Sequence, residues 1–260
     1  PVVQGHRHTG TTSCPGDLVF NRFGWLRQQV VARIAATASP ARWSPSTTGA
    51  AFFGRLDAAA AGGEVPNGTA GFFTSLVERA GWPRNDLAAA IVVSDTTESR
   101  IGLVDRLYRA AFVREAETGG LRYWVDRRDA GMSARSMART FTVTPEFRDR
   151  YDHLDDAAYV DAIYRNVLGR PAEPAGLAYW VTRLEEGTPR WEVLTLFSES
   201  PEHRATREVP GVITRTYLVM LDRAATAAER ATWMDTLAGG AEPSAVVAWL
   251  ASSEEFAIGA

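Results

Sequence analysis

The chain has 260 residues, of which 45% are hydrophobic, and a formal net charge of −3. This composition can supply one or two hydrophobic cores and is not that of a disordered chain. The slight negative charge argues against a nucleic-acid partner, because nucleic-acid binding needs a basic face. No apolar run approaches the roughly 20 residues that span a bilayer, and the single cysteine excludes an internal disulfide framework.

Residues 1–38 form the first predicted domain, a polar, turn-rich segment followed by a helix that Asp17 is expected to cap. His6 and Cys14 lie eight residues apart in this segment. Neutral imidazole and thiolate are the usual zinc ligands, and such a loop lets two of them converge on one ion. Two ligands alone hold zinc poorly, so a zinc site here needs a third ligand from elsewhere. The spacing by itself is weak evidence and is better explained by chance.

The surrounding residues, GHRHTGTTSCPGDLVFNRFGWLR, resemble the C-terminal end of the zinc N-acetylmuramoyl-L-alanine amidases, the family of the peptidoglycan recognition proteins and phage amidases. The resemblance implies that His6 and Cys14 are the second and third zinc ligands, and that Thr12 assists at the scissile carbonyl oxygen. His8 stands where that family usually has an aspartate. The family's first zinc histidine and catalytic tyrosine lie upstream of this motif. The chain therefore looks like a fragment, which we expect to be inactive alone and to bind zinc only with the upstream part present.

Residues 39–52 are rich in Ser, Thr, Pro and Gly and are predicted to be a linker. Repeats follow, because aromatic and charged residues recur at spacings of 56 and 53 residues. The recurring sets are Tyr108, Tyr164 and Tyr217; Trp124, Trp180 and Trp233; Phe141, Phe197 and Leu250; Arg114, Arg170 and Arg223; and Glu146, Glu202 and Glu255. Three clear repeats are predicted at 101–156, 157–208 and 209–260, preceded by a degenerate repeat at 53–100.

The repeat at 157–206 shows how each unit should fold. Apolar residues at helical spacing predict successive helices, separated by GRPAEPAG and by Gly187. Thr188-Pro189 and Ser200-Pro201 are predicted to start the third and fourth helices, and the acidic residues before Ala157 to cap the first. The predicted fold class is mainly α: tandem modules of three to four helices after a short remnant of an α/β amidase domain. Neighbouring modules are expected to pack together, because 50 residues is small for an independent core.

These units resemble the bacterial repeat called domain of unknown function 4214, whose signature is YR-x-x-LGR-x-x-x-x-x-G-x-x-YW. The repeat at 157–206 carries it most fully, in Tyr164-Arg165, Leu168-Gly169-Arg170, Gly176 and Tyr179-Trp180. The resemblance covers about 101–260 firmly and 53–100 loosely. The family is associated with secreted and surface proteins and its ligand is not established.

Two of the recurring residue types are candidate ligand-binding residues. Trp124, Trp180 and Trp233 could stack on a glycan, although each lies in an apolar helical face and core packing explains it more simply. Arg114, Arg170 and Arg223 could recognise an anionic wall polymer, but such arginines more often satisfy helix-end carbonyls or pair with a glutamate. His153 and His203, inside the repeats, are expected to have surface or core roles.

The sequence therefore favours the C-terminal part of an extracellular or cell-wall peptidoglycan amidase, whose repeats bind or anchor at the envelope. The alternative hypothesis is a non-catalytic surface or adhesion protein built of helical repeats. The predicted partner is peptidoglycan or another cell-wall polymer, with zinc as the only implied cofactor.

Overall fold

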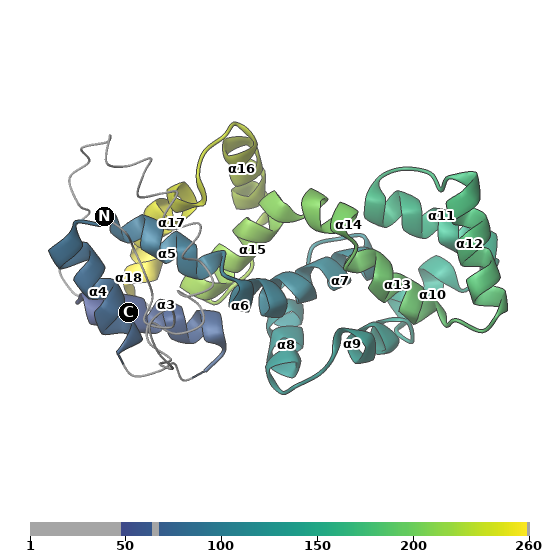
Figure 1. Cartoon of the computed structure of the whole chain (residues 1–260), viewed down its shortest axis with the longest axis horizontal. Coiled ribbons are helices and arrows are strands. Elements are labelled where there is room, and N and C mark those ends of the chain that lie inside the picture. Colours follow the sequence, from purple (N-terminus) through teal and green to yellow (C-terminus); the bar gives the residue numbers. More distant parts are fainter. Residues whose placement is uncertain (1–47, 64–67, 259–260) are drawn as a thin grey trace, which may run out of the picture. The chain divides into compact units, whose positions relative to one another are not determined.

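The computed structural model describes residues 48–63 and 68–258, and these residues form helices and no strand (Figure 1). The mainly α fold is therefore confirmed for this part of the chain. The predicted amidase remnant at 1–38 lies outside the described residues, as does most of the predicted linker. The first described helix begins at Gly49, capped by Thr48, and so takes in the last residues assigned to the linker. Phe52 is buried in it, which explains why the helix extends further than the repeat pattern suggested.

The helices fall into four successive groups that follow the four repeats. Repeat 1 contains α3 (Gly49–Ala61), α4 (Thr69–Ala80), α5 (Arg84–Val92) and α6 (Asp95–Thr97), and leads into the π-helical turn η2 (Glu98–Gly102). Repeat 2 contains α7 (Leu103–Phe112), α8 (Thr118–Asp129), α9 (Ala134–Phe141) and α10 (Pro145–Tyr151). Repeat 3 contains α11 (Asp156–Ile163), the π-helical η3 (Tyr164–Leu168), α12 (Pro174–Glu185), α13 (Arg190–Ser198) and α14 (Pro201–Thr206). Repeat 4 contains α15 (Glu208–Leu221), α16 (Ala227–Ala238), α17 (Pro243–Ala251) and α18 (Glu254–Ile258).

Capping residues fix where several of these helices begin. The Ser200 hydroxyl accepts the backbone N–H of His203 at the start of α14, with Pro201 at the first position, as predicted. Asp155 caps α11 by accepting the N–H of Ala158 at 2.8 Å, also as predicted. The prediction that Thr188 caps the third helix is wrong. Pro189 takes the cap position of α13 and no side chain caps it.

The end of each repeat's first helix needs a left-handed backbone. The residues there are Gly62, Val113, Gly169 and Asp222, with φ angles of 78°, 56°, 71° and 52°. A left-handed residue after the last helical turn lets the backbone N–H return to the helix's final carbonyls. Glycine adopts this conformation without strain, whereas a β-branched valine does not. All four repeats thus have the same left-handed turn, although only two of them have glycine at this position.

The chain divides into two compact units, which we describe separately. The central unit is residues 100–211 and holds repeats 2 and 3. The terminal unit contains the described residues up to 99 and from 212 onward, and so combines repeat 1 with most of repeat 4. Packing between sequence neighbours, as expected, holds for repeats 2 and 3. Repeats 1 and 4 share a unit although they are not neighbours in the sequence.

Both units join their two repeats through the third helices. In the central unit α9 packs against α13, and in the terminal unit α5 packs against α17. The buried side chains on these faces are Met137, Ala138 and Phe141 on α9; Val193, Leu194 and Phe197 on α13; Leu87, Ala88 and Ile91 on α5; and Val246, Val247 and Leu250 on α17. Burial of these apolar faces supplies much of the free energy that holds each pair together.

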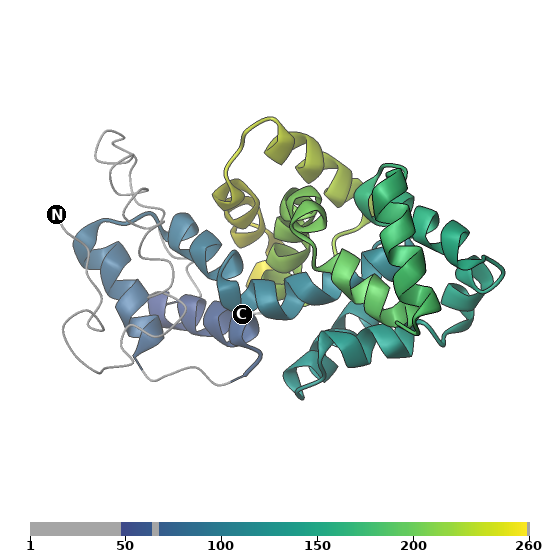
Figure 2. The same cartoon turned by 45° about the vertical axis from the view of Figure 1, so that its right-hand side comes forward.

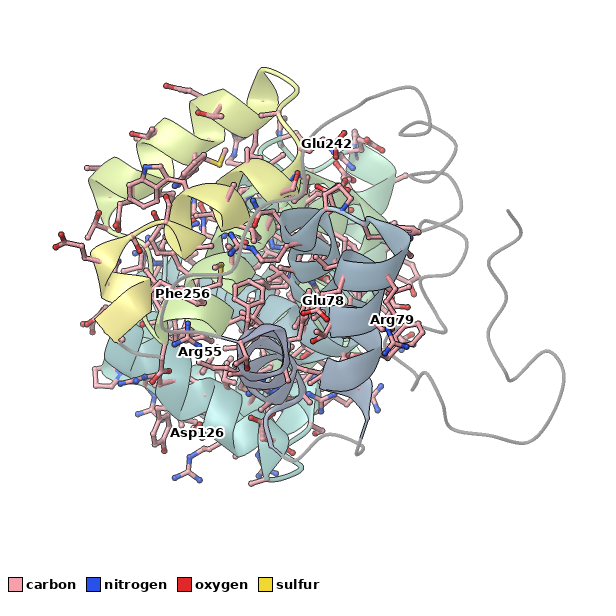
Figure 3. The ribbon with its side chains drawn as sticks, turned by 90° about the vertical axis from the view of Figure 1, so that its left-hand side faces the viewer. Arg55, Glu78, Arg79, Asp126, Glu242 and Phe256 are labelled. Atoms are coloured by element: carbon pink, nitrogen blue, oxygen red, sulfur yellow. The ribbon has the colours of Figure 1, made fainter. Side chains whose placement is uncertain are left out.

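Within the central unit, α7 also contacts α8, α10 and α13. Helix α11 packs against α12, and the ribbon views show the two side by side (Figures 1 and 2). In the terminal unit, α3 packs against α4 and α5, and its Phe53 ring lies 5.2 Å from the Phe73 ring of α4. The Arg55 guanidinium lies 3.7 Å from the ring centroid of Phe256, which joins α3 to α18 (Figure 3). Among the described residues, no helix combines the length and the apolar character that a membrane crossing requires.

Candidate functional site

The residues predicted to bind zinc and act in catalysis, His6, Thr12 and Cys14, lie outside the described part of the chain. Their roles therefore remain predictions. Within residues 48–63 and 68–258, no group of three or more His, Cys, Asp or Glu side chains is placed to hold a metal ion. His153 is exposed, and His203 is buried with its Nδ1 donating to the carbonyl oxygen of Val167 at 2.9 Å. Burial lowers the pKa of His203, which favours the neutral ring. Both histidines have the surface and core roles expected of them.

The recurring arginines each bind a glutamate 32 residues later. The three pairs are Arg114–Glu146, Arg170–Glu202 and Arg223–Glu255, with Nε–Oε1 distances of 2.7, 2.7 and 2.6 Å. In each pair the second guanidinium nitrogen reaches the second carboxylate oxygen, so the bond is bidentate. A second glutamate, Glu117, Glu173 or Glu229, contacts the same arginine from the start of the second helix. The guanidinium thus ties the first helix's end to the second and fourth helices of its own repeat.

This pairing changes the acid–base properties of the partners. Hydrogen bonds from Arg114 and Arg170 lower the pKa values of Glu146 and Glu202, and the bonds from Arg223 lower the pKa of Glu229 to about 2. Each arginine also lies over the recurring tyrosine of its repeat, 5.2 to 5.3 Å from the ring centroid. The recurring arginines therefore pair with glutamates, as the simpler of the two explanations for them predicts.

The recurring tryptophans pack inside their repeats. Trp124 lies 4.6 Å from the Phe141 ring, and Trp180 lies 5.3 Å from the Phe197 ring. Trp233 is buried and its Nε1 donates to the hydroxyl of Tyr217 at 3.1 Å. These contacts fit the core-packing alternative for all three tryptophans.

A second set of aromatic side chains faces solvent beside these tryptophans. Tyr123 is 48% exposed, Tyr179 57% and Trp249 51%. Their rings lie edge-on to Trp124, Trp180 and Trp233, with centroids 4.9, 5.0 and 5.8 Å apart. Each clear repeat thus pairs an inner tryptophan with an exposed ring. Sequence reasoning missed this set. The available signal was that Tyr179 lies off the apolar stripe of its helix while Trp180 lies on it.

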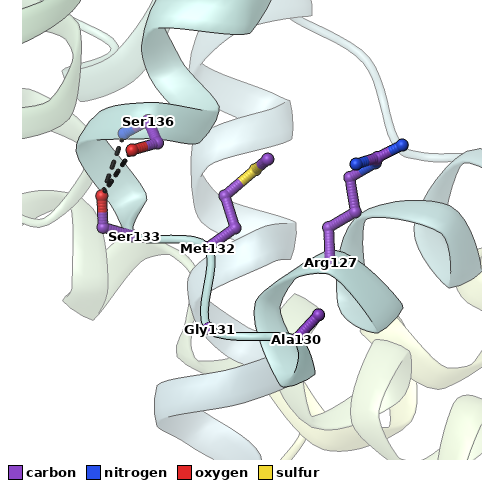
Figure 4. Close-up of a pocket in the computed structure, with 6 residues that line it drawn as sticks. All are labelled: Arg127, Ala130, Gly131, Met132, Ser133 and Ser136. Carbon is purple, nitrogen blue, oxygen red and sulfur yellow. Dashed lines mark hydrogen bonds between the residues drawn. The ribbon is translucent and has the colours of Figure 1, made fainter.

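The turn between α8 and α9 forms an open hollow of about 410 Å³ (Figure 4). Its lining residues are Arg127, Ala130, Gly131, Met132, Ser133 and Ser136. Ser133 caps α9 by accepting the backbone N–H of Ser136, and the two hydroxyls bond each other at 2.9 Å. The Arg127 guanidinium lies 4.5 Å from the centroid of the exposed Tyr123 ring. Arg127, which lines the hollow together with Ser133 and Ser136, thus also contacts the exposed Tyr123 ring.

Ion pairs between repeats are buried in the central unit. Arg207 follows α14, is 9% exposed, and donates to Asp105 of α7 at 2.9 Å and to both oxygens of Glu115. Burial pushes the pKa of Arg207 down, but the two carboxylates outweigh it and the net shift is upward. Arg106 of α7 forms a bidentate pair with Glu199 beside α13, at 2.9 Å for each bond. These contacts join repeat 2 to repeat 3, so we assign them to the fold.

The match to known families falls on this central unit. Residues 138–206 match the family model of a domain of unknown function, DUF4214. The DUF4214 match begins inside α9 and ends with α14, so it includes every helical segment of repeat 3 and the last part of repeat 2. No curated protein and no solved structure matches the chain. The span of the DUF4214 match thus includes α13 and the second half of α9, which pack against each other.

The repeated polar contacts thus divide by role. The recurring arginines and inner tryptophans, which the sequence analysis treats as candidate ligand-binding residues, form contacts inside their own repeats. The solvent-facing rings and the hollow beside Tyr123 are the features of the described residues whose chemistry remains available to a partner.

Proposed function

We propose that this chain is the C-terminal part of a secreted peptidoglycan amidase of the N-acetylmuramoyl-L-alanine type, whose helical repeats attach it to the cell envelope. The observation that carries the attachment role is the exposed aromatic ring beside the inner tryptophan of each clear repeat. Exposed flat rings offer stacking surface to the apolar faces of sugar rings. Several such rings on one chain raise the local enzyme concentration at a polymeric surface through multivalent attachment.

The amidase role rests on the resemblance of the segment around His6 and Cys14. Imidazole and thiolate form a donor set that suits zinc, and a zinc ion bound there would supply the Lewis acidity that amide hydrolysis needs. His6 and Cys14 would hold the ion, and Thr12 would assist at the carbonyl oxygen. The bond cleaved would be the amide between the lactyl group of N-acetylmuramic acid and L-alanine, with water as the second reactant.

The amidase role is tested on the full-length protein that carries this chain together with the upstream strands. We expect it to bind zinc and to release stem peptides from purified sacculi. The variants Cys14→Ser and His6→Ala should lose zinc and activity, while His153→Ala, at an exposed histidine, should change neither. A full-length protein without zinc and without peptide release would leave the non-catalytic surface protein as the better description.

The attachment role is tested by co-sedimentation of the full chain with insoluble sacculi. Replacing the three exposed rings together, Tyr123→Ala, Tyr179→Ala and Trp249→Ala, should lower the retained fraction strongly. The matched control replaces Val143 and Leu196 with alanine, because these side chains are also exposed apolar groups, at 54% and 47%. Wild-type retention no greater than that of an unrelated helical protein would overturn the proposal.

A further inference from the structure

The hollow between α8 and α9 has the size and the groups of a small-molecule subsite. Its volume of about 410 Å³ lies in the range of ligand pockets, roughly 300–1,000 Å³. In Figure 4 the Met132 side chain lies between the hydrogen-bonded Ser133–Ser136 pair and the Arg127 side chain. Glycine at 131, with φ of 92°, makes the tight turn that leaves the space open.

The polar groups around this hollow are held in place but keep bonding capacity. The edge contact with Trp124 orients the Tyr123 ring. A ligand that stacks on the exposed face of Tyr123 would therefore cost this side chain little conformational freedom. Within the part of the chain that the structure describes, Arg127 forms no ion pair, and its guanidinium contacts that ring. Its N–H donors are therefore available to an external acceptor, and a carboxylate matches their planar geometry.

Repeat 3 has the same turn, with Tyr179 and Arg183 in the positions of Tyr123 and Arg127 but without the two serines. Gly187 matches Gly131 in position and in φ, at 95°. However, Glu186, Pro189 and Glu192 stand where repeat 2 has Ala130, Ser133 and Ser136. Glu186 lies 3.9 Å from Arg183, the counterpart of Arg127, and Glu192 pairs with Arg135. The two added carboxylates would repel an anion, so the features for anion binding are confined to repeat 2.

We infer that Tyr123, Arg127, Ser133 and Ser136 form a subsite for a wall glycan from which the stem peptides have been removed. The inference rests on the proposed function. Hydrolysis of the lactyl–alanine amide adds water across the C–N bond, leaving a lactyl carboxylate on the sugar and an ammonium on the peptide. The sugar ring would stack on Tyr123 while the new carboxylate accepts hydrogen bonds from Arg127. The chain would thus recognise the glycan product of the reaction proposed for its parent protein.

The test measures binding of the full chain to soluble glycan strands that an unrelated amidase has stripped of peptides. Intact sacculi and stripped strands with esterified carboxylates serve as the comparison probes. Arg127→Gln and Tyr123→Ala should each weaken binding to stripped strands by about tenfold, the scale of one charge-assisted bond or one stacked ring. Tyr123→Phe should retain the stacking, and Arg183→Gln, the matched change in repeat 3, should leave binding unchanged. Circular dichroism checks that each variant is folded.

The outcomes separate the subsite from the broader proposal. If Arg127→Gln and Arg183→Gln weaken the binding of stripped strands equally, the subsite proposal is wrong, and the proposal of envelope attachment is unaffected. If the chain is retained on intact sacculi but does not bind stripped strands, the subsite proposal is likewise wrong and envelope attachment is unaffected. Equal binding of esterified strands overturns the recognition of the carboxylate. A chain retained by neither stripped strands nor sacculi overturns both proposals.

Discussion

The Nε of Arg170 lies 2.7 Å from one carboxylate oxygen of Glu202, and its Nη2 lies 3.0 Å from the other. The same bidentate contact across 32 residues occurs in repeats 2 and 4. It closes each repeat by tying the end of the first helix to the start of the fourth. Because the two side chains bind each other, the repeated arginine stabilises the fold. The planar guanidinium is essential for this contact, since it donates two parallel hydrogen bonds to one carboxylate.

The first prediction concerns this fork. In repeat 4, Arg223→Lys should lower the free energy of unfolding by about 0.5–1 kcal/mol, because a lysine cannot bind Glu255 and Glu229 bidentately at once. In a double-mutant cycle with Glu255→Gln, the two changes should be clearly non-additive. Arg230→Lys serves as a control in the same repeat, since Arg230 donates to the hydroxyl of Thr214 and is not part of this pair. Additive effects in the urea denaturation series would contradict the assignment.

The second prediction concerns the glycine of the repeat signature. A Cβ on Gly176 would overlap the hydroxyl of Tyr164, whereas a Cβ on Gly120, the equivalent position in repeat 2, would lie 3.6 Å from the hydroxyl of Tyr108. Gly176→Ala should therefore destabilise the chain by about 1–3 kcal/mol through overpacking. Gly120→Ala should be neutral or stabilising by about 0.5–1 kcal/mol, because alanine favours the helix.

Removing the obstructing hydroxyl provides the internal control. Tyr164→Phe should recover most of the stability lost in Gly176→Ala, although the ring carbon that bears the hydroxyl would still be close, at 3.3 Å. Thermal unfolding of the single and double variants measures this coupling. Equal losses in Gly176→Ala and Gly120→Ala would show that the close approach to Tyr164 does not explain the glycine.

The third prediction concerns the strained residue Val113. A β-branched residue at φ of 56° loses about 1–2 kcal/mol relative to ordinary backbone. Val113→Gly should thus raise the free energy of unfolding by about 0.5–1 kcal/mol, after allowing for the greater freedom of glycine in the unfolded chain. Val143→Gly, at a valine without positive φ, should instead destabilise. Conversely, Gly169→Ala should destabilise although a Cβ there meets nothing within 4 Å. A loss of stability in Val113→Gly would show that the valine side chain contributes more than its strain costs.

The fourth prediction concerns Asp57, a carboxylate of α3 that is 2% exposed. Burial raises its pKa from the ordinary 3.8 to about 6. The folded chain then binds a proton that the unfolded chain releases between these two pH values, so stability should fall as pH rises through this window. Asp57→Asn should remove this slope and should stabilise the chain at pH 7 by about 1–3 kcal/mol.

A matched change checks the sign. Glu229→Gln removes a carboxylate whose pKa is lowered from the ordinary 4.5 to about 2. The change should therefore lower the stability of the chain at pH values above 4.5. This loss of stability should disappear as the pH falls from 4.5 to about 2. Urea denaturation at a series of pH values from about 2 to about 7 distinguishes the two slopes. A wild type and an Asp57→Asn variant with parallel pH profiles would contradict the raised pKa.

Much of the described structure follows from local sequence patterns. The helical spacing of apolar residues and start signals such as Ser200-Pro201 predict most helix positions, because capping and periodicity act over a few residues. The register of Tyr, Trp, Arg and Glu identifies the repeats and places a tryptophan inside each of the three clear repeats. The Thr188-Pro189 pattern predicts a cap one residue earlier than the observed cap of α13 at Pro189, because a hydroxyl before a proline is a common start signal and helix boundaries are local features uncertain by a residue.

The sequence by itself therefore determined the helical repeats, their register and the candidate zinc motif, because these depend on neighbouring residues. Only the tertiary structure decided that repeat 1 pairs with repeat 4 through α5 and α17 while repeats 2 and 3 pair through α9 and α13. All four third helices have similar apolar faces, so local pattern cannot choose among partners. It likewise decided that Arg170 is bound by Glu202 while Arg127 lines the hollow, since burial and pairing depend on elements that are distant in the sequence.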